Sequence, residues 1–441
     1  MGRAARRSAR HAGDPAMRWI RPIAAESQET ADTVGGKADG LVVLHRLGLP
    51  VPPGFVITTE ACRAFLRDGR PPDGLSDEVA AAKAGLGSAT VSVRSGASVS
   101  MPGMMDTILN VDKRLMPSVE AVFSSWNTPR ARTYRELHDI PHDLGTAVIV
   151  QAMVLGDRDE HSGTGVAFSR DPNTGARTPF GEVLFGHQGE DVVSGRARTH
   201  PLHELAEREP AVWAELLDAL SRIEAHHRDA CYVEFTFESG VLWLLQVRSG
   251  GYAGAAAVRV ATDLAGEQVI SRTEALLRVS PQHLVRTPRM TADHVLARGL
   301  GACPGVATGR VASTTDSAVR MAVEGPVILV RPETSPHDMR GLAAAAGVVT
   351  ERGGPASHAA VVARSMGKPA VVGVSGFTIA EGTLITIDGT SGEIALGSQP
   401  STTTADAHLA RLLGWADDVS GDHTERAEAE RLRAAHAVLS R

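Results

Sequence analysis

Apolar and polar residues alternate with a period of two through VEFTFESGVLWLLQVR, and this alternation predicts a β-hairpin. The apolar positions are Val233, Phe235 and Phe237 on the first strand and Trp243, Leu245 and Val247 on the second. Because a slip of one residue turns every side chain to the other face, the length of the loop decides which residues lie together. A three-residue loop over residues 239–241 puts all of these apolar residues on one face. We therefore predict this loop, with Gly240 at positive φ.

The predicted register places Glu234 directly opposite Gln246 on the other face of the hairpin, with Arg248 two residues further along. Carboxylate and amide oxygens are hard ligands that suit Mg²⁺, and a guanidinium group suits a phosphate. A polar outer face is also typical of an ordinary half-exposed sheet. The hairpin alone leaves both interpretations open, and the ordinary sheet is the more common of the two.

The hydrophobic pattern elsewhere mixes helices and strands, which predicts the α+β or α/β class. WAELLDALSRIEAHHRD has the period of an amphipathic helix, TAVIVQAMVLG reads as a buried strand, and PVILVR, PAVVGV and LITID are later strands. We divide the chain into a disordered basic arm (1–17), a first domain (18–285), a linker (286–301), a second domain (302–397) and a helical tail (398–441).

Composition and charge exclude several classes of protein. The 441-residue chain has a formal net charge of −6 and no domain-wide basic surface, so we expect no nucleic-acid partner. The longest apolar run is well below the ~20 residues that a membrane helix needs, so we expect no membrane partner either. The three cysteines are far apart and form no C-x-x-C pair, which favours a cytoplasmic location.

Two glycine-containing segments are candidates for phosphate binding. In VSVRSGASVSMPGMMDTILN, Arg94 ends a strand and Gly96 permits a turn, while Ser95 offers a hydroxyl. The loop that continues to Gly103 can wrap phosphates with backbone N–H groups. Lys37 follows two glycines at a predicted helix start, which suits a phosphate contact. Each signal is weak alone, because turns and solvated lysines are common.

The stretch ERGGPASHAAVVARSMGKPAVVG places His358 at the start of a predicted helix. One interpretation is a helix cap near a core, and the other is a nucleophile. Imidazole is largely unprotonated near neutral pH, since its reference pKa is about 6.5. At a helix N-terminus, a phosphorylated product would meet free N–H groups and the positive end of the dipole. Gly353 and Gly354 permit the sharp turn, and Ser357 can cap the helix or donate to the phosphate.

Long segments of the chain, over residues 30–397, resemble one family. The resemblance to the nucleotide-binding domain of the pyruvate, phosphate dikinase family rests on GGKADGL, GLPVPPGFVITTEAC, SVRSGASVSMPGMMDTILN, SSWNTPRARTYRELHDIP, SGTGVAFSRDPNTG, GEDVVSG and VEFTFESGVLWLLQVRSG. The resemblance to its phosphohistidine domain rests on ILVRPETSPHDM and ERGGPASHAAVVARSMGKPAVVG. It implies an ATP-grasp domain followed by a swivelling β/β/α domain.

The resemblance also implies roles for individual residues and two cofactors, ATP and Mg²⁺. Glu234 and Gln246 match the Mg²⁺ ligands, and His358 matches the histidine that carries the phosphoryl group. The implied nucleotide-binding residues are Lys37, Arg94, Ser95, Gly96, Gly103, Gln151, Glu190, Asp191 and Arg248, of which Arg94 and Arg248 are also implied in catalysis.

Four features depart from the family. Tyr232 stands where the family has an acidic residue, and Ala356 replaces a threonine that is a regulatory phosphorylation site in some members. A helical insert is missing between ILN and SVEAVF, and the carboxyl-terminal barrel that binds pyruvate or phosphoenolpyruvate has no counterpart in this sequence. Loss of the threonine implies loss of that regulatory switch.

We therefore expect an ATP-dependent phosphotransferase of the dikinase type, which forms phosphohistidine on His358 and releases AMP. The γ-phosphoryl group goes to inorganic phosphate or to water. The phosphohistidine then serves a small-molecule acceptor or a substrate on a separate subunit. The alternatives are one component of a split pyruvate, phosphate dikinase that makes phosphoenolpyruvate with a separate barrel protein, and a non-catalytic phosphocarrier or regulatory protein.

Overall fold

The computed structural model describes residues 17–101, 103–189, 199–252, 254–284, 288–354, 357–402 and 406–440. The predicted arm therefore lies outside the described residues, apart from Met17. The chain forms two compact units. The first contains the described residues up to Arg46 together with Pro52–Met153, and the second contains Leu47–Val51 and the described residues from Val154 onward. Helices, antiparallel strands and parallel strands all occur, which confirms the predicted mixed class.

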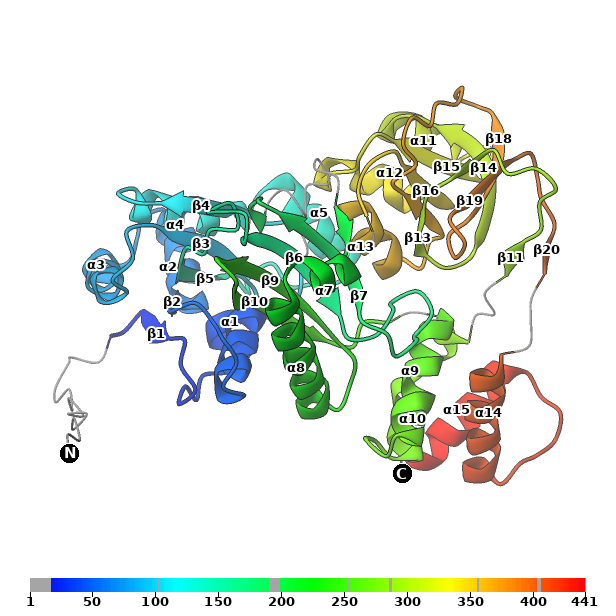
Figure 1. Ribbon diagram of the computed structural model, residues 1–441, viewed down its shortest axis with the longest axis horizontal. Coiled ribbons are helices and arrows are strands. Elements are labelled where there is room, and N and C mark those ends of the chain that lie inside the picture. Colours follow the sequence, from blue (N-terminus) through cyan, green and yellow to red (C-terminus); the bar gives the residue numbers. More distant parts are fainter. Residues whose placement is uncertain are drawn as a thin grey trace. The chain divides into compact units, whose positions relative to one another are not determined.

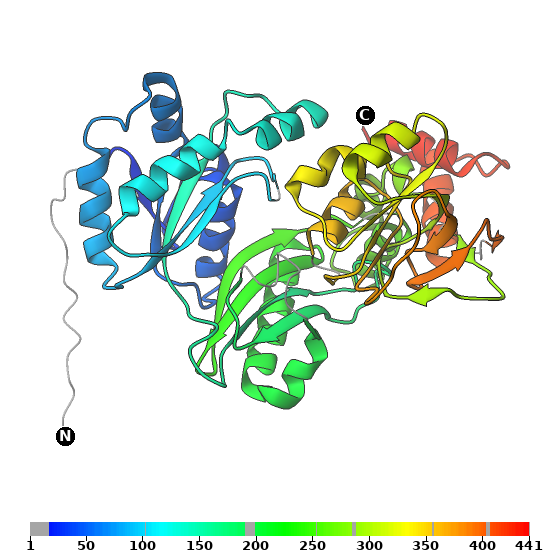
Figure 2. The same ribbon diagram turned by 90° about the horizontal axis from the view of Figure 1, so that it is seen from above.

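The first unit is built on an antiparallel sheet with the strand order β1-β2-β5-β3-β4. Its strands are β1 (Ile20–Pro22), β2 (Gly54–Ile57), β3 (Val91–Gly96), β4 (Thr107–Val111) and β5 (Ala147–Ala152). Its helices are α1 (Ala31–Arg46), α2 (Thr59–Asp68), α3 (Leu75–Gly85), α4 (Leu115–Ser125) and α5 (Pro129–Leu137). Figure 2 shows the sheet strands flanked by helices in the blue and cyan part of the chain.

The core of the first unit lies between its sheet and helices α2, α3 and α4. Strand β5 reads AVIVQA and is buried on both faces, which explains its almost unbroken apolar sequence. Helix α2 starts at Thr58, whose side chain accepts a hydrogen bond from the Ala61 N–H group, and ends at Gly69 in the left-handed conformation. These signals fix both ends of the helix that covers the sheet.

The second unit begins with a sheet in the order β10-β9-β6-β7-β8, called here the second sheet. Its strands are β6 (Gly163–Phe168), β7 (Phe180–Phe185), β8 (His200–Pro201), β9 (Cys231–Glu238) and β10 (Val241–Ser249). The short segments η1 (Leu202–Glu204) and α7 (Leu205–Arg208) lead into helix α8 (Pro210–His227). Helix α8 is the amphipathic helix that the sequence predicts, and it packs against β9 and β10.

The β9–β10 hairpin corrects the predicted loop length. Val241 pairs with Glu238, so the turn holds two residues rather than three. Ser239 and Gly240 both have positive φ, 50° and 77°, as a tight hairpin turn with the native twist requires. Gly240 was therefore assigned correctly, and Ser239 was missed. The three-residue loop is wrong because the prediction assumed that the alternation continues without interruption along both strands.

A β-bulge between Leu244 and Gln246 restores the predicted pairing of Glu234 with Gln246. The bulge adds one residue to β10, which compensates for the shorter turn. The apolar faces differ from the prediction as a result. The core-facing pairs are Leu242 with Phe237, Leu244 with Phe235 and Val247 with Val233, whereas Trp243 pairs with Thr236 on the opposite face.

The third sheet has the order β12-β19-β18-β14-β15-β16-β17-β13. Within it, β14, β15, β16 and β17 pair in chain order, and each of these pairs is parallel. Its strands are β12 (Ala297–Arg298), β13 (Leu300–Cys303), β14 (Val306–Ala312), β15 (Val327–Arg331), β16 (Gly347–Thr350), β17 (Ala370–Val372), β18 (Leu384–Asp388) and β19 (Glu393–Leu396). Its helical segments are α11 (Thr315–Met321), η3 (Pro336–Asp338), α12 (Met339–Ala344) and α13 (His358–Ser365). Residues 297–301, expected in the linker, thus contribute to this sheet.

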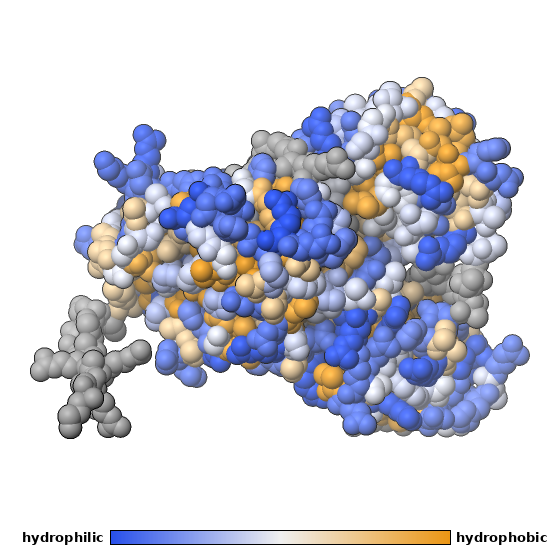
Figure 3. Space-filling view, in the orientation of Figure 1, coloured by the Kyte–Doolittle hydropathy of each residue, from blue (hydrophilic) through white to orange (hydrophobic). Residues whose placement is uncertain are grey.

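The domain built on the third sheet has apolar surface. Figure 3 shows orange residues over the region of β14, β15 and β18. The exposed large apolar side chains of this domain include Leu300, Val323, Leu384 and Leu396. Their exposed fractions range from 39% for Leu384 to 88% for Val323.

A helical cluster forms the rest of the second unit. It contains α9 (Gly254–Gly266), α10 (Arg272–Arg278), η2 (Pro281–His283), α14 (Ala407–Ser420) and α15 (Glu428–Leu439). Figure 1 shows α14 and α15 beside α9 and α10, and the four share one apolar core. Between α10 and α14 the chain enters the third-sheet domain through β11 (Arg289–Met290) and leaves through β20 (Ser401–Thr402), which pair with each other. Both connections therefore run through one two-stranded ribbon.

A buried arginine ties the helical cluster to the second sheet. The side chain of Arg170 is fully buried and forms ion pairs with Glu224 of α8, at 2.6 Å, and with Glu267 just after α9, at 2.8 Å.

In the part of the chain that the structure describes, every helix is too short or too polar to reach across a lipid bilayer.

Candidate functional site

His358 is the first residue of helix α13. Gly353, with φ of 89°, turns the chain toward it, and Ser357 at the N-cap has an extended backbone. The Nδ1 atom of His358 lies 3.1 Å from Oγ1 of Thr334. Its Nε2 atom is buried and has no hydrogen-bond partner among the described residues. The ring is thus held through one nitrogen while the other remains available for chemistry.

Electrostatics keeps this ring neutral. Burial lowers the pKa of His358 to about 4, and the nearby carboxylate of Asp338 only partly offsets this effect. At neutral pH the imidazole therefore has an unprotonated nitrogen, which a nucleophile requires. His358 is not the cap of this helix, because the N-cap residue is Ser357. Ser357 makes no side-chain capping bond, and its buried hydroxyl has no partner among the described residues.

The loop that supplies Thr334 is itself tightly organised. Oδ2 of Asp338 accepts hydrogen bonds from the Ser335 N–H group at 2.9 Å and from its hydroxyl at 3.1 Å. The other carboxylate oxygen accepts a bond from the Thr315 hydroxyl at 2.9 Å. Sequence reasoning missed Thr334 and Asp338 as parts of the site. The signal was present in ETSPHD, since a serine followed three residues later by an acid is typical of a helix start.

The second sheet presents a polar face built from neighbouring strands. Glu234 on β9 lies opposite Gln246 on β10, and Tyr232 lies opposite Arg248. Because residues i and i+2 on a strand share a face, these four side chains lie on the same side. The hydroxyl of Tyr232 donates a hydrogen bond to Oε1 of Glu234 at 3.2 Å. Gln246 is only 1% exposed, yet neither its Oε1 nor its Nε2 atom has a partner among the described residues.

This face has the donor chemistry for Mg²⁺. A buried amide without a partner is costly, and a bound cation would give its oxygen one. The facing carboxylate of Glu234 adds an anionic oxygen. In nucleotide sites, Mg²⁺ is bound by one or two protein oxygens together with phosphates and water. The predicted pair therefore fits the ion.

In the first unit, the start of α1 meets the end of β3. Gly35 has φ of 77°, and a Cβ atom built on it would overlap the carbonyl oxygen of Gly96. The Gly36 N–H group donates to the carbonyl of Ala97 at 2.9 Å. A Cβ built on Gly96 would lie 3.5 Å from the Cβ of Lys37. The structure thus brings the predicted lysine and the predicted glycine turn together, and only glycine at position 35 permits this approach.

The same strand carries Arg94, whose guanidinium donates to Oε1 of Gln151 on β5. The amide nitrogen of Gln151 donates to the carbonyl of Pro52 at 2.9 Å. Both side chains are buried, as is that of Ser95. Gly103 lies in the following loop with φ of 69°. Arg94 and Gln151 therefore form one bonded pair on adjacent strands.

The predicted site residues fall into three groups. Lys37, Arg94, Ser95, Gly96, Gly103 and Gln151 belong to the first unit. Glu234, Gln246, Arg248 and His358 belong to the second unit. Glu190, Asp191 and Ala356 lie outside the described residues.

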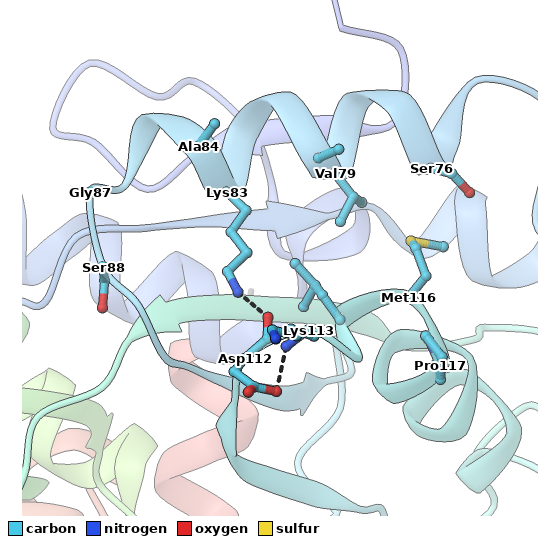
Figure 4. Close-up of a pocket in the computed structure, with 12 residues that line it drawn as sticks. Ser76, Val79, Lys83, Ala84, Gly87, Ser88, Asp112, Lys113, Met116 and Pro117 are labelled. Atoms are coloured by element: carbon cyan, nitrogen blue, oxygen red, sulfur yellow. Dashed lines mark hydrogen bonds between the residues drawn. The ribbon is translucent and has the colours of Figure 1, made fainter.

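A separate cavity of about 530 Å³ lies in the first unit, between α3 and the start of α4. Figure 4 shows Lys83 reaching across it to the backbone of Asp112, to which its ammonium group donates a hydrogen bond. The β4–α4 connection, where the sequence predicts a missing insert, forms one wall. The lining, as far as the structure describes it, includes none of the residues predicted to bind nucleotide or metal.

Comparison with known proteins matches both parts of the chain. The family described as pyruvate phosphate dikinase, AMP/ATP-binding domain, matches residues 31–81 and 67–208. The family described as PEP-utilising enzyme, mobile domain, matches residues 323–392, which contain α13 and His358. Pyruvate, phosphate dikinase of Rhizobium meliloti is 35% identical over 550 residues, covering 94% of this chain and 61% of that protein. The chain therefore contains an AMP/ATP-binding domain of the pyruvate phosphate dikinase type and a mobile domain of the PEP-utilising enzyme type.

Other pyruvate, phosphate dikinases align over similar spans. Pyruvate, phosphate dikinase of Clostridium symbiosum is 33% identical over 91% of this chain and 60% of its own length. Pyruvate, phosphate dikinase 2 of Oryza sativa is 34% identical over 88% of this chain and 58% of its own length. The chain thus spans about 60% of the dikinases that it matches. Within the family match, the AMP/ATP-binding part contains Lys37, Arg94 and Gln151.

Proposed function

We propose that this protein is an ATP-dependent phosphotransferase of the dikinase type, which forms phosphohistidine on His358 and releases AMP. The observation that carries the proposal is the state of His358. Its imidazole is neutral at physiological pH, its Nδ1 atom is held by Thr334, and its Nε2 atom has no partner among the described residues. A core histidine that served only packing would gain from a hydrogen bond at both nitrogens.

The tautomer follows from the attack. Nδ1 keeps its proton and donates to Oγ1 of Thr334, which leaves the lone pair on Nε2. Nε2 forms a bond to the β-phosphorus while the bond from that phosphorus to the AMP oxygen breaks. The γ-phosphoryl group has already moved to inorganic phosphate or water. The free N–H groups at the start of α13 then stabilise the anionic phosphoryl group, and the hydroxyl of Ser357 is free to donate to it.

The remaining predicted residues would neutralise the negative charge of the nucleotide's phosphate groups. Lys37, Arg94 and Arg248 are the cations that would hold the triphosphate, because phosphoryl transfer depends mainly on positioning and electrostatics. Glu234 and Gln246 would hold Mg²⁺, which when bound neutralises phosphate charge. The unpartnered amide of Gln246 supports this role. Glu190 and Asp191 remain predicted nucleotide contacts.

The acceptor of the phosphoryl group is proposed by class. It is either a small molecule or a substrate held by a separate protein. In the second case, this chain would be one component of a split pyruvate, phosphate dikinase. A non-catalytic phosphocarrier with an inactive nucleotide domain is the competing function. The bonded Arg94–Gln151 pair and the metal-fitting pair of Glu234 and Gln246 favour catalysis over that alternative.

The test is incubation of the full-length chain with Mg²⁺ and ATP labelled at the β or the γ position. We expect acid-labile label on the protein from the β position only, with AMP formed in parallel. The His358→Asn variant should incorporate none, whereas His294→Asn, which changes an exposed histidine of the same unit, should label normally. Absence of both label and AMP, with or without inorganic phosphate, contradicts the proposal. Label supplied only by another phosphoprotein indicates a phosphocarrier instead.

A further inference from the structure

Tyr232 stands two residues before Glu234 on strand β9. The structure gives this tyrosine a specific partner. Its hydroxyl lies 3.2 Å from Oε1 of Glu234, two residues along the same strand. The chain therefore presents a hydrogen-bond donor to the carboxylate of Glu234.

The ring that carries this hydroxyl is fixed by its neighbours. Tyr232 lies opposite Phe168 on β6 and opposite Arg248 on β10. Its ring centroid is 4.9 Å from that of Phe168, with the ring planes tilted by 57°. It also packs with Val166 and Leu184 of the second sheet. Contacts on both sides leave the ring little freedom, so the position of the hydroxyl oxygen is set by the sheet.

A tyrosine hydroxyl is protonated at neutral pH and can therefore donate this hydrogen bond. A carboxylate has about four acceptor sites, and this bond occupies one site on Oε1. The other sites of Glu234 remain available to a cation. The bond also limits the rotation of a side chain that would otherwise lose its conformational freedom on binding the metal.

We propose that Tyr232 is a positioning residue that holds the Glu234 carboxylate opposite Gln246, so that the two form a preorganised oxygen pair for one Mg²⁺ ion of the nucleotide complex. This inference rests on the proposed function, because it assumes that Glu234 and Gln246 bind the metal. It goes beyond that function by assigning a role to Tyr232. A tyrosine that served only packing would be replaced by phenylalanine without effect on the metal.

The test measures binding of the non-hydrolysable β,γ-imido analogue of ATP to the full-length chain by calorimetry while Mg²⁺ is titrated. Tyr232→Phe keeps the ring and removes the hydroxyl. We expect the Mg²⁺ midpoint to rise roughly threefold to tenfold, as loss of a typical intramolecular hydrogen bond implies. Tyr252→Phe is the matched control, since that hydroxyl bonds the backbone of Arg170 at 2.7 Å, and it should leave the midpoint unchanged.

A double-mutant cycle separates positioning from packing. If Tyr232 acts through the carboxylate of Glu234, removing its hydroxyl should change nothing further on a Glu234→Ala background. An unchanged Mg²⁺ midpoint in Tyr232→Phe overturns the inference, and so does a shift that persists in full on the Glu234→Ala background. If the wild-type chain binds the analogue without any dependence on Mg²⁺, the metal site and the inference both fail. Phosphoryl transfer is not needed for this measurement, so failure of His358 to accept label leaves it intact.

Discussion

Glu234 and Gln246 face each other across the β9–β10 hairpin, and a bulge in β10 between Leu244 and Gln246 brings them into register. Bulges are common beside functional sites, because they re-aim a side chain without moving the rest of the strand. Here the bulge places a buried amide, with no partner among the described residues, directly across from a carboxylate. Stability and metal binding should therefore respond in opposite directions when this amide is removed.

Replacing Gln246 with methionine tests that opposition. The variant removes a buried polar group without a partner while keeping a similar volume. We expect the free energy of unfolding to rise by about 1 kcal/mol. The Mg²⁺ concentration needed for nucleotide binding should rise about tenfold, because an oxygen ligand is lost. Urea unfolding and calorimetric titration give the two values. A loss of stability in Gln246→Met would indicate that the amide has a structural partner.

Thr334→Val removes the hydroxyl that holds Nδ1 of His358 and keeps the shape of the side chain. The rate of label incorporation from ATP should fall about tenfold, since the ring loses the partner that fixes its tautomer and orientation. Thr334→Ser retains a hydroxyl and should remain close to the wild type. Initial rates in a rapid-quench experiment provide the comparison. Equal rates in the valine and serine variants would show that the hydroxyl has no role in the transfer.

The pH dependence of phosphorylation should reflect the lowered pKa of His358. The neutral ring reacts, and burial lowers its pKa to about 4, so the rate should hold as the pH falls from 7 toward 5. An unperturbed histidine would already lose half of its neutral form near pH 6.5. Single-turnover rates, quenched in base to protect the product, test this. A midpoint near 6.5 would contradict the burial that the structure shows.

The same shift predicts how stability depends on pH. The folded pKa of about 4 lies below the unfolded value of about 6.5, so the unfolded chain binds the extra proton between these values. The free energy of unfolding contributed by His358 is therefore fully present above pH 6.5 and decreases as the pH falls toward 4. His358→Asn should flatten this part of the profile. Urea midpoints collected between pH 4 and 7 measure the difference.

Gly35→Ala should disrupt the junction between α1 and β3. The residue has positive φ, and an added Cβ would overlap the backbone of Gly96. We expect a destabilisation of at least about 1–3 kcal/mol, together with weaker nucleotide binding because Lys37 is displaced. Gly69→Ala is the matched control. That glycine also has positive φ, but an added Cβ would meet nothing within 4 Å, so the variant should lose stability alone.

Arg170→Met should leave two carboxylates without their cation. Because this arginine is fully buried between Glu224 and Glu267, we expect a loss of about 3–5 kcal/mol in the free energy of unfolding. Arg177 contacts the same Glu267 at 3.6 Å, but its side chain is 69% exposed. Arg177→Met should therefore cost less than about 1 kcal/mol. Thermal and urea unfolding of both variants provide the comparison.

The sequence could predict the hairpin pairing but not the way in which it forms. Period-two alternation gave the two strands and the pairing of Glu234 with Gln246. It could not give the bulge at Leu245, because that residue is apolar like Trp243 and Leu244 before it and no glycine marks the position. The predicted turn was one residue too long, and the predicted strand pairing lacked the one-residue bulge, so the two errors compensated for each other. Alternation therefore shows which residues share a face only where the strand pairing is regular.

The environment of His358 shows the other limit of sequence reasoning. A helix start after a glycine turn was predictable from local signals, and α13 begins at this residue. The contact with Thr334 was not, since it joins residues 24 positions apart in the sequence and depends on the order of the strands in the third sheet. The bond from Tyr232 to Glu234 depends on side-chain rotamers, which the residue pattern leaves open.

The two-stranded ribbon of β11 and β20 has a consequence for the order of folding. The apolar core of the helical cluster needs α14 and α15, which follow the third-sheet domain in the chain, as well as α9 and α10, which precede it. Since chains emerge from the ribosome from the N-terminus, α9 and α10 must wait with one apolar face uncovered. The domain that carries His358 can therefore fold before α14 and α15 complete the helical cluster to which it is connected.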